Sequence, residues 1–102
     1  MSNLIKEVHS QQDIDDLYKA GNNVILKFGA PWCAPCKIVD KTLEEISDET
    51  DIVIAKVNVD DQPEIAGKYG VMSLPTIFII EDGITVNRYI GVKAKSELIS
   101  QF

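Results

Sequence analysis

Two cysteines separated by two residues are the side chains of this sequence best suited to chemistry. Cys33 and Cys36 lie in the stretch Ala-Pro-Trp-Cys-Ala-Pro-Cys-Lys, residues 30–37, and they are the only cysteines among the 102 residues. Residues three apart lie on the same face of a helix, so a helix that starts here would let the two sulfurs form a small disulfide. The pair is therefore predicted to be a reversible dithiol.

The two sulfurs are not expected to be equivalent. The thiolate is the nucleophile in disulfide exchange, and the free N–H groups and the positive dipole end at a helix start lower the pKa of a cysteine placed there. Cys33 has that position, whereas Cys36 lies further in, where burial disfavours the anion. Pro35 is tolerated in the first turn of a helix, where its missing N–H costs nothing, and it stiffens the small ring that the disulfide would close. Cys33 is predicted to attack and Cys36 to resolve.

Metal binding and inert burial are the alternatives for the pair. A structural zinc site usually has four ligands, and His9 is the only other imidazole or thiol in the chain, so no metal site is predicted. Two inert core thiols would not require Trp32 immediately before the pair or Pro35 within it. His9 is itself interpreted as a surface or helix-capping residue rather than a catalytic one.

Strands and helices are predicted to alternate around this pair. In chain order they are a short strand over Leu4–Val8, a helix capped by Ser10, a strand over Val24–Phe28, a helix over about Ala34–Glu49, a strand over Ile52–Val59, a short helix ending at Gly70, a hairpin of Thr76–Ile80 and Thr85–Ile90, and a terminal helix. The first strand–helix–strand unit after the opening helix should be a right-handed parallel crossover, with the cysteines beyond the carboxyl end of a central strand. The predicted class is α/β, with a mixed sheet and helices on both faces.

The residues around the dithiol resemble a known family. Trp32 to Lys37 looks like the active-site hexapeptide of the thioredoxin family, with Ala34 where that family most often has Gly. The resemblance continues through residues 55–60, through Leu-Pro-Thr at 74–76, through Asp-Gly at 82–83 and to Gly91. It implies the thioredoxin fold, a single domain over residues 1–102 with a central mixed sheet of about five strands flanked by four helices.

The resemblance also implies a substrate groove. Thioredoxin-like proteins have a cis proline at the position of Pro75, beside the dithiol, where the backbone of the preceding residue pairs with an extended segment of the substrate. Without the resemblance, a proline at the start of a strand would be interpreted as a residue that limits further pairing at a sheet edge. The residues alone do not place Pro75 next to Cys33. The residues assigned to substrate binding are Trp32, Ala34, Pro35, Leu74, Pro75 and Gly91.

Three positions depart from the family's pattern: Lys27 stands where most thioredoxins have a buried Asp, Gly29 where many have a second Trp, and Lys41 where the helix usually has a kinking Pro. A buried ammonium without a partner costs several kcal/mol, so Lys27 is expected to be partly neutral, to reach water or to meet an acid. Asp40, one turn after Cys36, is the candidate partner for Lys27 or Lys56, and the alternative is a solvated helix residue.

These three charged residues, Lys27, Lys56 and Asp40, are predicted to tune the pKa values of the cysteines. A charged Lys27 would favour the thiolates, and stabilising the reduced form makes the disulfide more oxidising.

Charge and length restrict the partners and the location. One hundred and two residues suffice for one hydrophobic core. The net charge of −6 argues against a nucleic-acid-binding protein, which would present a basic surface. The first six residues contain no apolar signal segment, and no stretch approaches 18 consecutive apolar residues, so neither export nor membrane insertion is expected. The expected location is the reducing cytoplasm, where a cysteine pair is typical of catalysis rather than of a structural bridge.

The predicted function is the reduction of protein disulfides by dithiol exchange through Cys33 and Cys36. No bound cofactor is expected, because the electrons travel on the two sulfurs, and a thioredoxin-reductase-type flavoprotein is expected to restore the dithiol of a monomeric protein. Two alternatives remain open. One is an oxidase or isomerase with the same fold, and the other is a non-catalytic module that binds partners in the groove at Trp32 and Pro75.

Overall fold

The structure is a computed structural model that describes residues 5–102, so Leu4 of the predicted first strand lies outside the described residues. The strands within this range are β1 (Ile5–Glu7), β2 (Val24–Gly29), β3 (Val53–Asn58), β4 (Thr76–Glu81) and β5 (Ile84–Ile90). The helices are α1 (Gln11–Ala20), α2 (Ala34–Glu49), α3 (Pro63–Lys68) and α4 (Lys95–Ile99). The order of elements follows the prediction.

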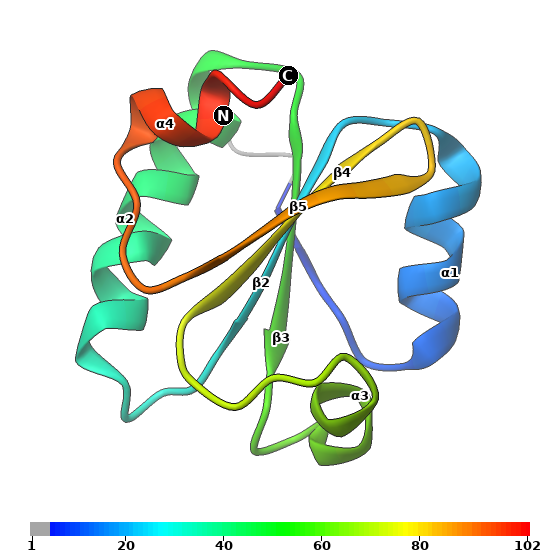
Figure 1. Ribbon diagram of the computed structural model, residues 1–102, viewed down its shortest axis with the longest axis vertical. Helices are drawn as coiled ribbons and strands as arrows, with labels where there is room; N and C mark the ends of the chain where they lie inside the picture. Colours follow the sequence, from blue (N-terminus) through cyan, green and yellow to red (C-terminus); the bar gives the residue numbers. More distant parts are fainter. Residues whose placement is uncertain (1–4) are drawn as a thin grey trace.

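The five strands form one mixed sheet in the order β1-β3-β2-β4-β5. The strands β1, β3 and β2 are parallel, whereas β4 runs antiparallel to β2 and pairs with β5 as a hairpin. Figure 1 shows α2 and α4 on one face of this sheet and α1 and α3 on the other. The predicted fold class is confirmed by this arrangement.

Each face of the sheet has its own apolar core. The residues of β2 alternate between the faces, so that Leu26 and Phe28 pack with α1 and α3 while Ile25 packs with α2 and α4. The buried stripe predicted for α2 is confirmed, since all four of its residues are buried, namely Cys36, Val39, Leu43 and Ile46. By the same alternation, Lys27 and Gly29 lie on the face of β2 that α2 covers.

Several boundaries differ from the predicted ones by one or more residues. The strand β1 ends at Glu7, although Val8 is still buried and donates its N–H to the Lys56 carbonyl at 2.9 Å. The strand β3 is shorter at both ends, because the Ile52 N–H is bound to Thr50 Oγ1 at 3.1 Å and a turn closed by the Asn58 side chain follows the strand. The Thr50 side chain thus takes the Ile52 N–H before the strand, whereas the Val59 N–H still donates to the Gly29 carbonyl at 2.9 Å after it.

The central strands place the two cysteines. The parallel pair β2 and β3 ends on the same side of the sheet, and β2 leads through residues 30–33 into α2. The beginning of α2 consequently lies beyond the carboxyl end of a central strand, as expected. Within residues 5–102, no helix has the length and hydropathy needed to cross a membrane.

Candidate active site

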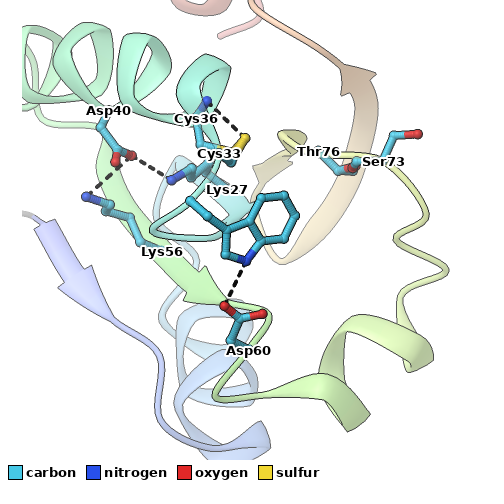
Figure 2. The surroundings of a disulfide bond; sticks show 9 residues. Lys27, Cys33, Cys36, Asp40, Lys56, Asp60, Ser73 and Thr76 are labelled. Atoms are coloured by element: carbon cyan, nitrogen blue, oxygen red, sulfur yellow. Dashed lines mark hydrogen bonds and ion pairs between the residues drawn. A yellow bond between two sulfur atoms is a disulfide. The ribbon is translucent and has the colours of Figure 1, made fainter.

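Cys33 and Cys36 form a disulfide at the start of α2 (Figure 2). Their Cα atoms are 5.3 Å apart, a separation that a disulfide spans without moving the backbone. Cys33 is the N-cap residue of α2, and its Sγ accepts the N–H of Cys36 at 3.3 Å. The predicted pairing and the predicted place of Cys33 at a helix start are both present.

The local sequence explains why the helix begins here. The Cys33 N–H closes a turn on the Ala30 carbonyl at 3.2 Å, and the Cys33 carbonyl then accepts the Lys37 N–H at 3.3 Å as a first helical hydrogen bond. Pro35 occupies the first turn, where a helix needs no N–H donor. Both cysteines are buried, with Cys33 5% and Cys36 1% exposed, and Cys36 belongs to the stripe that α2 turns toward the sheet. The cysteine predicted to attack is thus at the start of the helix, and the cysteine predicted to resolve is one turn inside it.

The segment before β4 meets the dithiol. The peptide bond between Leu74 and Pro75 is cis, as the resemblance implied, and Leu74 packs against the buried cluster of Ala30, Cys33 and Cys36. The Gly91 N–H, at the end of β5, donates to the Pro75 carbonyl at 2.9 Å. Residues far apart in the sequence are therefore assembled around the disulfide, although their assignment to substrate binding remains a prediction.

Trp32 is the large exposed apolar residue beside the dithiol. Its side chain is 70% exposed, and its Nε1–H donates to Asp60 Oδ2 at 2.9 Å. The Asp60 N–H in turn donates to Asn58 Oδ1 at 2.9 Å, so the turn after β3 fixes the indole's partner. The sequence placed Asp60 in the stretch that carries the resemblance, but its contact with Trp32 was not predicted.

Met72 is a second large exposed apolar residue that the sequence analysis did not single out. It is 94% exposed in the loop between α3 and the cis proline, two residues before Leu74. A methionine in so exposed a place is unusual, because this side chain is normally buried. A large apolar residue within a loop that leads to an assigned site residue is the signal that could have identified it.

A charged cluster lies on the inner side of α2 (Figure 2). Lys27 Nζ donates to Asp40 Oδ1 at 2.7 Å, and Lys56 Nζ lies 3.4 Å from the same oxygen. Lys27 is 4% exposed and is the register partner of Lys56 across β2 and β3. The predicted contact between Asp40 and the lysines is present, and the Asp40 side chain is also partly exposed to solvent.

No metal-binding group is found in the described part of the chain. Among residues 5–102, no three or more His, Cys, Asp or Glu side chains are arranged to hold a metal ion. His9 is exposed, and its N–H donates to Asp13 Oδ2 at 2.8 Å, at the start of α1.

A mixed sheet with a disulfide at the start of the helix after a central strand, against which the residue before a cis proline packs, defines a class of thiol-disulfide oxidoreductases. A sequence model of the thioredoxin family, described as "Thioredoxin", matches residues 5–102. The chain belongs to the thioredoxin family.

Curated relatives and solved structures agree with this assignment. The chain is 38% identical over 100 residues to a thioredoxin of Mycoplasma genitalium, covering 97% of this chain and 98% of the relative, and 46% identical over 77 residues to a thioredoxin of Bacillus subtilis, covering 74% of each. Among solved structures, a mutant thioredoxin from Halobacterium salinarum superposes with a TM-score of 0.90 at 29% identity, covering 98% of this chain and 88% of that one. The chain is accordingly a thiol-disulfide oxidoreductase of the protein-disulfide reductase type.

Proposed function

We propose that this chain works in the cytoplasm as a monomeric, single-domain reductant of protein disulfides, with Cys33 as the attacking residue and Cys36 as the resolving residue. The observation that carries the proposal is the position of Cys33 at the N-cap of α2, where its Sγ already accepts a helix N–H. The same donor and the positive helix end favour a thiolate on Cys33 in the reduced protein. Cys36, one turn further in, can then resolve the intermediate.

The exchange proceeds in two balanced steps. The Cys33 thiolate attacks one sulfur of the partner's disulfide, a bond forms between the two chains, and the other partner sulfur leaves as a thiolate. Cys36, after loss of its proton, then attacks Cys33 Sγ, and the second partner sulfur leaves with the electron pair of the broken bond. The partner gains two electrons, and this chain gains the Cys33–Cys36 disulfide.

The substrate would bind to the residues that surround the attacking sulfur. The β4 ladder begins at Thr76, so Leu74 precedes the first paired residue of the strand, and its backbone can add to an extended peptide. Pro75 and Gly91 are bound to each other, and Trp32 supplies an exposed apolar wall, with Ala34 and Pro35 at the helix start. Recognition through backbone groups explains how one site can accept many protein disulfides.

Each turnover leaves the chain oxidised, so a second protein must return two electrons. A thioredoxin-reductase-type flavoprotein fits this requirement, because a flavin passes electrons to a disulfide. The reducing cytoplasm supports such a cycle, since a cysteine pair kept reduced there is available for attack.

Trapping of mixed disulfides tests the two roles. A Cys36→Ser variant should accumulate disulfide-linked proteins from a reduced and then mildly oxidised lysate, because the bond to Cys33 can form but is not resolved. A Cys33→Ser variant, as the matched control, should trap few or none. Equal trapping by both variants, or trapping through Cys36 alone, would contradict the assignment.

A further inference from the structure

Lys27 lies close to the resolving cysteine, with Gly29 between them. A methyl group added to Gly29 would lie 2.5 Å from Lys27 Nζ and 3.2 Å from Cys36 Sγ. Because both atoms lie this close to the same methyl position, Lys27 Nζ is within about 6 Å of Cys36 Sγ. In this range a positive charge stabilises a neighbouring anion. The absent side chain of Gly29 leaves the space that the ammonium occupies.

The charges around Lys27 do not balance. One carboxylate, Asp40, contacts both Lys27 and Lys56, so two ammonium groups share a single acid. A cavity of about 220 Å³ adjoins this cluster, and the charged residues that line it are Glu7, Lys27, Lys37, Asp40 and Lys56. Three of these are basic and two are acidic, so the charged side chains that line the cavity carry a net charge of +1.

The cavity also gives the buried Lys27 side chain access to water. Its volume admits several water molecules, and its lining offers polar partners for them. Lys27 Nζ, in a side chain that is 4% exposed, also donates to Asp40 Oδ1 at 2.7 Å.

We propose that Lys27 is a positioning residue for the resolving step, in which its ammonium, held by Asp40, favours the thiolate of Cys36. The proposal rests on the proposed function and deepens it. In the mixed disulfide, the Cys36 thiol loses its proton to solvent, and the thiolate attacks Cys33 Sγ. The bond between Cys33 and the partner breaks, and the partner's sulfur leaves as a thiolate with the electron pair.

Two substitutions should act in opposite directions. Lys27→Met removes the positive charge while keeping much of the side-chain volume, so the Cys36 thiolate should be harder to form. Asp40→Asn removes the acid that offsets the ammonium, so the thiolate should be easier to form. If Lys27 and Asp40 had only a structural role, both substitutions would lower the stability of the protein, but they would not change the formation of the Cys36 thiolate in opposite directions.

The test uses 5,5′-dithiobis(2-nitrobenzoate) on the reduced protein in a stopped-flow instrument. The first thionitrobenzoate released reports the attack by Cys33, and the second reports the attack of Cys36 on the adduct. Lys27→Met should move the midpoint of the pH profile of the second release up by about one unit, a tenfold loss of rate below the midpoint. Asp40→Asn should move that midpoint down.

Lys19→Met is the matched control, because Lys19 is an exposed lysine of α1, on the opposite face of the sheet. It should leave the second-release profile unchanged. An unchanged or lowered midpoint in Lys27→Met, an equal shift in Lys19→Met, or a raised midpoint in Asp40→Asn would overturn the proposal. Circular dichroism checks that each variant is folded, and Lys27→Gln replaces Lys27→Met if the latter is not.

The site of the first adduct distinguishes a failure of this proposal from a failure of the proposed function. Peptide mapping should place the first adduct of the wild type on Cys33. An adduct on Cys36 would overturn the assignment of roles itself. A correct wild-type adduct together with an unchanged Lys27→Met profile would overturn only the role of Lys27.

Discussion

Gly29→Ala tests whether the Lys27 side chain fills the space above Gly29. The added methyl group would lie 2.5 Å from Lys27 Nζ, 2.6 Å from Lys27 Cε and 3.2 Å from Cys36 Sγ, all closer than ordinary contact. Gly29 does not have a positive φ, so the backbone itself accepts alanine without strain. The cost therefore comes from the clash with Lys27 and from any loss of its contact with Asp40.

Overpacking of this kind costs typically about 1–3 kcal/mol, and we expect Gly29→Ala to lower the free energy of unfolding by about 2 kcal/mol. For a domain of this size each kcal/mol lowers Tm by about 4–8 °C. Urea unfolding of the oxidised protein, followed by circular dichroism, measures the difference, and an unchanged m-value shows that the unfolded state is the same.

A double-mutant cycle identifies the clashing residue. In a Lys27→Ala background the nearest atoms are gone, and Gly29→Ala should cost less than about 1 kcal/mol, giving a coupling energy above about 1 kcal/mol. The same cost in both backgrounds would refute the reasoning, because the methyl group would then be meeting something other than Lys27.

Three further predictions concern the site. Iodoacetamide at neutral pH should label Cys33 of the reduced protein well before Cys36, and peptide mapping that found equal labelling would contradict the unequal roles. Lys27→Asp should raise the thiol pKa values and lower the reduction potential, by about 30 mV for each pKa unit of a single thiolate, and a glutathione equilibrium that moved the other way would contradict the effect of Lys27. Asp60→Ala removes the acceptor of the Trp32 indole, a hydrogen bond worth about 0.5–1.5 kcal/mol. It should slow the reduction of protein disulfides several-fold while leaving reaction with a small disulfide unchanged; equal effects on both substrates would count against a docking role for Trp32.

The sequence predicted what periodicity and local chemistry determine. The place of Cys33 at a helix start follows from the buried strand before it and from the stripe after Cys36, and both are present. The contact between Asp40 and Lys27 was predicted from one-turn spacing and the cost of a buried ammonium. These arguments need only neighbouring elements.

The parts that depend on loops could not be predicted from pattern. Pro75 is far from the two cysteines in the sequence, and only the resemblance to thioredoxins indicated that it lies beside them. The partner of Trp32 is set by the turn that Asn58 closes, and no periodicity specifies that geometry. The role of Gly29 as space for Lys27 depends on three side chains from two elements and is visible only in the packing.

A redox titration against glutathione, followed by Trp32 fluorescence, tests the central claim that Cys33 and Cys36 form a reducing dithiol. The wild type should show a single two-electron transition that the Cys33→Ser, Cys36→Ser double variant lacks. We predict a reduction potential below roughly −220 mV, in the range of disulfide reductants. A potential near about −180 to −120 mV, where isomerases and oxidases lie, would contradict the account.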